Sequence, residues 1–283
     1  MKLARASQAK NAGIHPDDSF YCQHRGGRSF FVPVFGEAPM SFDYLALAAV
    51  VLAAFGASTL AAIAGFGGAV VMLPVLVWAF GVRDAIPILT VAQLIGNLSR
   101  VWLNRTELSW PVVNWFALGA VPSAVFGGVI FATAPAAALV RGLGVFLLAM
   151  AAYRHTSWGK RARLTLHGFL PLGAASGALS ALLGSVGPFM APFFLAYGLV
   201  KGAYIGTEAM STVVMHIVKL LVYGGFTLIG AQTLVAGLAI GCVMIGGSYV
   251  GKRLLTRVPE RVFPHIIEAV LVFAGLLFLI RGA

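Results

Sequence analysis

The chain has 283 residues, of which 59% are hydrophobic and only 10% are charged, whereas soluble domains are about 45–50% apolar and about 25% charged. This composition, with a mean hydropathy of +0.91, excludes an ordinary soluble enzyme and indicates a chain that lies mainly in a lipid bilayer. The net charge of +11 is spread between apolar segments, which indicates positively charged cytoplasmic loops rather than nucleic-acid binding. Cys22 lies in a polar stretch and Cys242 in an apolar one, so the sequence shows neither a disulfide framework nor metal-ligand spacing.

Residues 1–41 form a polar tail that we expect to be irregular, without an apolar run long enough for a signal peptide. Met40 stands directly before the first apolar segment. One hypothesis is therefore that translation starts at Met40 and that the preceding residues are not part of the natural protein. Peptides from residues 1–39 of the natural protein would contradict this hypothesis.

Ten apolar segments follow in chain order, at 42–64, 69–81, 85–103, 112–131, 136–153, 166–183, 189–199, 203–226, 231–250 and 262–280. The segments 69–81 and 189–199 are too short to cross about 30 Å of hydrocarbon at about 1.5 Å per residue. We therefore predict an all-α polytopic membrane protein with eight to ten transmembrane segments, two of which are short or re-entrant.

The basic residues predict how the chain is oriented. If each short segment forms a hairpin with its predecessor, the basic stretches 154–165 and 252–261 fall on one side of the membrane. The positive-inside rule makes that side cytoplasmic and places both termini outside. A fusion of each short segment with its predecessor would put the two stretches on opposite faces, so the hairpin arrangement is preferred.

The chain matches itself when it is shifted by 118 residues, which places Pro74 on Pro192 and Arg83 on Lys201. The match predicts two five-segment repeats, 42–153 and 166–283, joined by the basic loop 154–165. Because five is odd, the second repeat must enter the membrane in the opposite sense. Such inverted repeats are typical of secondary transporters.

Each half contains a glycine-rich break directly before its short segment. The first break contains Gly65, Gly67 and Gly68 and is followed by Pro74; the second contains Gly184, Ser185, Gly187 and Pro188 and is followed by Pro192. Unwound backbone at membrane depth is tolerated where it is buried in protein or lines a water-filled cavity, and helix N-termini attract anions. Close helix packing is the simpler interpretation of one break, but duplication in both halves favours an anion site.

Polar side chains follow one face of two corresponding segments. They include Thr90, Gln93, Asn97 and Arg100 on 85–103, and Glu208, Thr212 and Lys219 on 203–226, with His216 beside the second face. Ionisable residues at membrane depth are functional candidates by default. We expect Asn97 and His216 at a midplane site, with Arg100 and Lys219 guiding an anion at the two mouths.

Other roles for the ionisable residues stay open. Snorkelling to the headgroups explains Arg100 equally well, and a structural hydrogen bond is the commoner role of a lone histidine such as His216. Glu208 and Lys219 share a helix face but lie about 16 Å apart, too far to pair. Glu208 or His216 could carry a coupling proton, since both groups can titrate near neutral pH in a suitable environment.

The breaks at 64–76 and 182–199, together with IGTEAMSTVVMHIVKLLVYGG at 205–225, resemble the sulfite exporter TauE/SafE family of bacterial membrane permeases. The resemblance extends over roughly residues 42–280. It implies a multi-pass inner-membrane permease that moves small, often sulfur-containing anions outward, coupled to an ion gradient and without a metal or organic cofactor. The second break departs from the family's glycine triplet, so sulfite, sulfonates, sulfoacetate-like anions and thiosulfate all stay open as substrates.

We therefore predict a non-enzymatic anion transporter in which the two halves rock around the midplane site. Its partners are the lipid bilayer and the anion, not nucleic acid, and a homo-oligomer is left open. One rival is an intramembrane hydrolase using Ser176 or Ser185 with His216, which a serine-directed probe would label. The other is a non-transporting scaffold, which is favoured if Arg100 and Lys219 tolerate alanine.

Overall fold

The computed structural model describes residues 20–25, 28–33, 44–65, 68–153, 164–184 and 186–254, and isolated residues between 272 and 280. The chain divides into two compact units, Met1–Asp43 and Tyr44–Ala283. Residues 154–163 of the basic loop and most of the last apolar segment lie outside the described residues. The membrane orientation therefore stays a prediction.

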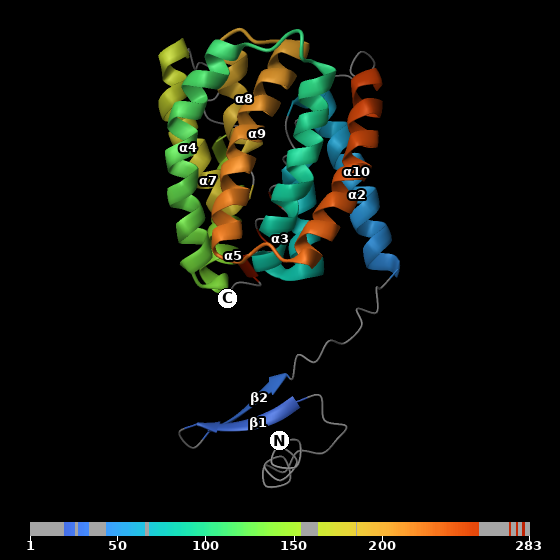
Figure 1. Cartoon of the computed structure of the whole chain (residues 1–283), viewed down its shortest axis with the longest axis vertical. Coiled ribbons are helices and arrows are strands. Elements are labelled where there is room, and N and C mark those ends of the chain that lie inside the picture. The colour runs from blue at the N-terminus through green and yellow to red at the C-terminus, as the bar shows by residue number, and fades with distance from the viewer. Residues whose placement is uncertain are drawn as a thin grey trace. The chain divides into compact units, whose positions relative to one another are not determined.

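The first unit contains a β-hairpin (Figure 1), although the sequence predicts irregular structure for this part of the chain. Strand β1 (Phe20–Arg25) pairs antiparallel with β2 (Arg28–Pro33), with Tyr21 opposite Val32. The strands are rich in aromatic residues, which favour extended backbone. Only two residues, Gly26 and Gly27, separate the strands, and Gly-Gly is typical of a two-residue hairpin connection.

The described part of the second unit contains eight α-helices and one short 3₁₀ helix. They are α2 (Tyr44–Ala64), α3 (Gly68–Leu103), α4 (Trp110–Thr133), α5 (Ala136–Tyr153), η1 (Leu166–Gly168), α7 (Phe169–Leu183), α8 (Gly187–Ala196), α9 (Lys201–Gly225) and α10 (Ala231–Leu254). Six spans, formed by α2, α3, α4, η1 with α7, α9 and α10, are long and apolar enough to cross a membrane. The described helices agree with the predicted helical, multi-pass membrane protein, whereas the eight to ten transmembrane segments and the two repeats stay predictions.

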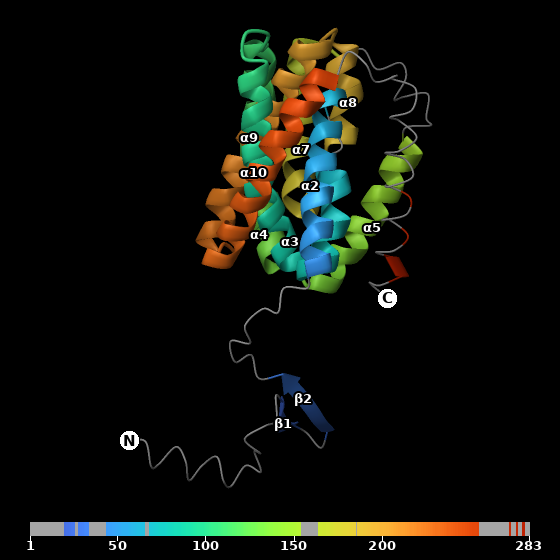
Figure 2. The ribbon, with the colours of Figure 1, turned by 90° about the vertical axis from the view of Figure 1, so that its right-hand side faces the viewer.

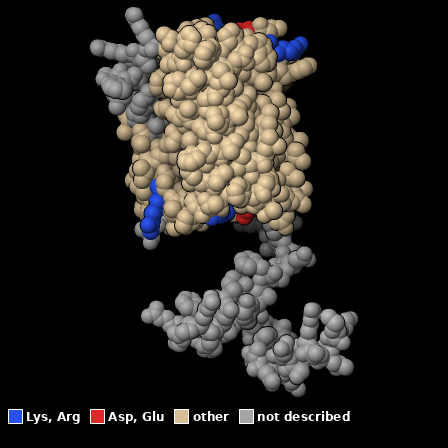
Figure 3. Space-filling view, turned by 60° about the vertical axis from the view of Figure 1, so that its left-hand side comes forward, with Lys and Arg blue, Asp and Glu red and all other residues tan. Residues whose placement is uncertain are grey.

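The surface of the helical unit suits a bilayer. Large apolar side chains face outward, and Leu52 and Leu221 are both 73% exposed. On the face shown in Figure 3, Lys, Arg, Asp and Glu lie at the two ends of the unit, and the band between them shows none of these residues. Contact of such a band with water would be unfavourable, whereas lipid tails accept it.

Both short segments predicted from hydropathy are helical. α8 has 10 residues and reaches only about 15 Å, about half of the hydrocarbon thickness. The other short segment forms the first part of α3 and ends at Gly81, whose φ of 74° and ψ of 162° are not helical. The predicted segments 69–81 and 85–103 are thus two parts of one interrupted helix.

The helices pack into two groups, which lie on opposite sides of Figure 1, and Figure 2 looks onto the side where α2 and α10 pack together. We call α2, α3 and α10 the α2 bundle, and α4, α7 and α9 the α4 bundle; α3 contacts α9 between them. Small residues allow close packing within each bundle. A Cβ at Gly173 of α7 would overlap the backbone of α4, and one at Gly251 of α10 would overlap the backbone of α2. Each bundle therefore combines helices from both halves of the sequence.

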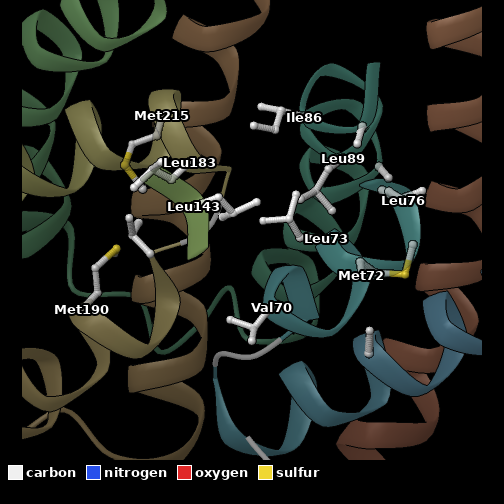
Figure 4. Close-up of a cluster of buried hydrophobic side chains, with 14 of the residues drawn as sticks. Val70, Met72, Leu73, Leu76, Ile86, Leu89, Leu143, Leu183, Met190 and Met215 are labelled. Carbon is white, nitrogen blue, oxygen red and sulfur yellow. The ribbon is translucent and has the colours of Figure 1, made fainter. Parts of the chain in front are cut away.

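Apolar side chains fill the space between the bundles. Figure 4 shows Leu73 and Leu89 of α3 beside Leu143 of α5, Leu183 of α7 and Met215 of α9. Since these residues come from both bundles, the core fixes how α3 and α9 face each other. That placement positions the polar residues of the same two helices.

Candidate functional site

The two predicted breaks have the same backbone geometry. Gly65 after α2 has a φ of +79°, and Gly184 after α7 has a φ of +80°. The N–H of Gly65 donates to the carbonyl of Ala61 at 2.8 Å, and that of Gly184 donates to the carbonyl of Ser180 at 2.9 Å. Positive φ at a helix C-terminus favours glycine, so these glycines end both helices.

A small cavity lies beside the two breaks. The space open to the centre of a water molecule is about 30 Å³, enough for at least one water. Its walls are formed by Gly68, Ala69, Gln93, Asn97, Arg100, Ser180, Gly184, Val186, Gly187, Glu208, Thr212 and His216. Gly68 begins α3 and Gly187 begins α8, so two helix N-termini, which carry partial positive charge, meet this cavity.

Two buried amide groups of α3 complete the walls. The side-chain nitrogens of Gln93 and Asn97 have no hydrogen-bond partner in the described part of the chain. The Asn97 oxygen accepts a hydrogen bond from Arg100, and Gln93 Nε2 would lie 3.3 Å from a Cβ at Gly68. Since a buried donor without a partner costs about 1–3 kcal/mol, a ligand with acceptor oxygens would be stabilised here.

Arg100 and Glu208 form an ion pair that joins the two bundles. Arg100 Nη1 lies 3.5 Å from Glu208 Oε2, and it also donates to the carbonyls of Gly65 at 3.0 Å and Ala61 at 3.4 Å. Glu208 Oε1 accepts from Thr212 at 3.2 Å. Arg100 is only 5% exposed, so the interpretation of Arg100 as a snorkelling side chain is wrong.

Lys219 makes the corresponding contact at the second break. Lys219 Nζ donates to Ser180 Oγ at 3.0 Å and lies 3.4 Å from the Ser180 carbonyl. The side chain is fully buried and does not line the cavity. Within the described residues, Lys219 forms no ion pair.

Arg100 and Lys219 make the same kind of contact at the two breaks. Each cation reaches the carbonyl oxygen that also accepts the N–H of the break glycine. Ala61 and Ser180, Gly65 and Gly184, and Arg100 and Lys219 are all 119 residues apart. Glu208, by contrast, corresponds to Leu89, so the same shift gives Lys219 no carboxylate.

Most of the predicted site residues line the cavity, namely Gly68, Asn97, Arg100, Gly184, Gly187, Glu208 and His216. Gly65 contacts Arg100, and Lys219 does not line the cavity. Gly67 and Ser185 lie outside the described residues. His216 is buried, and its Nδ1 has no hydrogen-bond partner among the described residues. Of the predicted helix-breaking prolines, Pro188 and Pro192 lie in α8 and Pro74 in the first part of α3.

Sequence reasoning missed two contacts at the breaks. Tyr204 lies one turn before Glu208, and its ring occupies the space where a Cβ at Gly65 would be. Ser180 supplies the acceptor for Lys219. For Tyr204, the available signal was its position on the polar face of 203–226.

Ser176 and His216 do not form the Ser–His dyad of a hydrolase. Ser176 is fully buried, and its hydroxyl has no hydrogen-bond partner in the described part of the chain. It is therefore not bonded to His216. Ser185, the other candidate nucleophile, lies outside the described residues.

Comparison with known protein families gives a match over most of the chain. The model of the sulfite exporter TauE/SafE family matches residues 50–278, a range that contains both breaks and the cavity. The chain belongs to the TauE/SafE family. No curated protein and no solved structure gives a significant match. TauE/SafE proteins are membrane transporters, and the six apolar spans of this member fit that role.

Proposed function

We propose that this TauE/SafE protein is a secondary transporter that moves a small anion across the bacterial inner membrane. The observation that carries the proposal is the cavity in which two helix N-termini meet the unpartnered amide nitrogens of Gln93 and Asn97. Helix N-termini and amide donors bind anions well, because their N–H groups point at the ligand. The site supplies donors for which the described residues provide no acceptor.

The expected substrates are sulfur-containing oxyanions such as sulfite or an organosulfonate. Their several oxygens accept hydrogen bonds from convergent donors at once. The family description, sulfite exporter, supports this class. The formal charges of Arg100 and Glu208 cancel in the cavity wall, so the helix N-termini and neutral amides supply the attraction.

We further propose that transport occurs by alternating access, in which the α2 bundle moves relative to the α4 bundle. Helices α3 and α9, one from each bundle, supply most of the polar cavity wall, so movement between the bundles would change access to the cavity. The matched contacts of Arg100 and Lys219 support two inverted repeats, the architecture typical of such transporters. In this arrangement the moving units are the bundles rather than the two sequence halves.

A binding experiment tests the anion site. The full chain, purified in detergent, is heated with sulfite, sulfate, thiosulfate, sulfoacetate, methanesulfonate or taurine, with acetate as the carboxylate control. An anion that binds only the folded protein raises its melting temperature. We expect a sulfur oxyanion to do so selectively.

Asn97→Asp sharpens this experiment, because it replaces the cavity donor by a negatively charged acceptor of the same shape. We expect the anion-dependent stabilisation to disappear in this variant. Asn104→Asp is the matched control, since Asn104 lies just beyond α3, contacts Lys252 and does not line the cavity. Equal stabilisation of the wild type and Asn97→Asp by the same anion would contradict the site, and the lack of a shift with any anion would count against the function.

A further inference from the structure

We propose that the transported anion displaces Glu208 from Arg100 and that Glu208 then takes up a proton, so that one proton moves with each monoanion. The proposal rests on the proposed function, because the anion occupies the same cavity. It assigns the coupling ion, which neither the family nor the fold specifies.

The geometry of the ion pair allows this exchange. The separation of 3.5 Å between Arg100 Nη1 and Glu208 Oε2 exceeds the roughly 2.7–2.9 Å of a strong charge-assisted hydrogen bond. The same nitrogen lies closer, at 3.0 Å, to the Gly65 carbonyl. Arg100 therefore stays anchored to the break when the carboxylate leaves, and its charge stays at the cavity wall.

Glu208 has surroundings that accept both of its protonation states. Its Oε1 atom faces the Thr212 hydroxyl at 3.2 Å, and a hydroxyl can either donate to a carboxylate or accept from a carboxylic acid. Both residues line the cavity. Proton transfer at Glu208 thus leaves no new unpaired polar group.

Charge balance requires the proton. With Glu208 ionised, the pair is neutral, and an added monoanion would bring an uncompensated negative charge into a medium of low dielectric. When the Glu208 carboxylate binds a proton, the acid is neutral and Arg100 is balanced by the anion. One proton and one negative charge enter together, and no covalent bond other than O–H forms or breaks.

Few other groups can carry this proton. The sequences of α4, α7 and α8, which pack around α9, contain no titratable side chain. On α9 itself, Tyr204, His216 and Lys219 flank Glu208, and α3 contributes Arg100 to the cavity. Among the described residues that line the cavity, Glu208 is the one carboxylate, and His216 is the other side chain that could take up or release this proton.

The test uses the full chain in phosphatidylcholine vesicles that contain a pH-sensitive dye, with labelled methanesulfonate outside. Methanesulfonate remains a monoanion at neutral pH and therefore carries no proton of its own. We expect its entry to acidify the vesicle interior by one proton per anion. An imposed gradient of one pH unit should concentrate the anion about tenfold in the more alkaline compartment, because one pH unit equals a tenfold ratio of proton concentrations.

Glu208→Gln should still bind methanesulfonate, because glutamine resembles the protonated acid, but its accumulation ratio should fall to about one. Glu107→Gln is the matched control and should keep the tenfold ratio, since Glu107 does not line the cavity. If the wild type carries the anion without protons, or Glu208→Gln keeps the tenfold ratio, the coupling proposal is wrong and the proposed function stands. If no anion moves, both fail.

A second measurement does not depend on any variant. Addition of methanesulfonate to the weakly buffered wild-type protein in detergent should remove one proton from solution per anion bound. Binding without proton uptake would overturn the proposal. Loss of coupling in His216→Gln, with coupling intact in Glu208→Gln, would assign the proton to His216 and overturn it as well.

Discussion

The break after α2 and the break after α7 share their backbone but differ in their side chains. Both end in a glycine with φ near +80°, and in both a cation contacts the carbonyl four residues earlier. At the first break the cation, Arg100, also binds Glu208; at the second, Lys219 binds only Ser180 within the described residues. Helix termination is thus repeated along the chain, whereas an ion pair is found, among the described residues, only at the first break.

Removal of the two cations gives the largest expected contrast. Arg100→Met leaves the Glu208 carboxylate buried without its partner, and breaking a buried ion pair in this way costs about 3–5 kcal/mol. Lys219→Met removes a buried charge that has no ion-pair partner among the described residues, so we expect a much smaller loss or a gain in stability. Thermal unfolding of both variants in the same detergent measures the difference.

The double variant Arg100→Met/Glu208→Gln is the control for this contrast. It should recover much of the lost stability, because no unpaired buried charge remains. If Arg100→Met and Lys219→Met lower the melting temperature equally, the charges at the two breaks do not differ as described.

The break glycines give a contrast of intermediate size. Alanine at Gly65 or Gly184 has to adopt a positive φ, which costs about 1–2 kcal/mol. A Cβ at Gly65 would also overlap the Tyr204 ring, whereas one at Gly184 would make ordinary contacts of 3.4–3.6 Å. We therefore expect Gly65→Ala to lower the melting temperature more than Gly184→Ala.

Gly224→Ala serves as the reference for both substitutions, since a Cβ at Gly224 meets nothing within 4 Å. Its melting temperature should match that of the wild type or exceed it. If Gly184→Ala lowers the melting temperature as much as Gly65→Ala does, the overlap with the Tyr204 ring does not add to the cost at the first break.

The smallest expected effect comes from Ser180→Ala, which gives the second break the alanine that the first has at Ala61. Lys219 would lose the acceptor at 3.0 Å and keep the carbonyl. Since one hydrogen bond contributes about 0.5–1.5 kcal/mol, the melting temperature should fall slightly. A loss that approaches that of Arg100→Met would mean that the serine contributes far more than one hydrogen bond.

Local patterns in the sequence predicted most of the described helices and several of the residues that line the cavity. Glycines and prolines marked both breaks, because their backbone constraints act within a few residues. Helical periodicity placed Asn97 on the polar face of 85–103 and Glu208 on that of 203–226. The match between the two halves set Asn97 opposite His216.

Contacts between distant segments could not be predicted in this way. The Arg100–Glu208 pair joins residues 108 apart in the chain and depends on how α3 crosses α9. The position of Tyr204 against Gly65 depends on how α9 packs against the end of α2, and the contact of Lys219 with Ser180 depends on how α9 packs against α7. The packing of α2 against α10 and of α4 against α7 could not be predicted either. The sequence of an apolar helix without a charged face does not indicate which helix it packs against.

The composition of the α2 bundle has a consequence for how the protein is made. Thr59 of α2 donates a hydrogen bond to Gly247 of α10 at 3.2 Å across 188 residues of chain. During synthesis α2 enters the membrane long before α10 has been made. Until then, the surface of α2 that packs against α10 is in contact with lipids or with other helices. Contacts of such long sequence separation form slowly. The bundle is therefore completed only after α10 has left the ribosome.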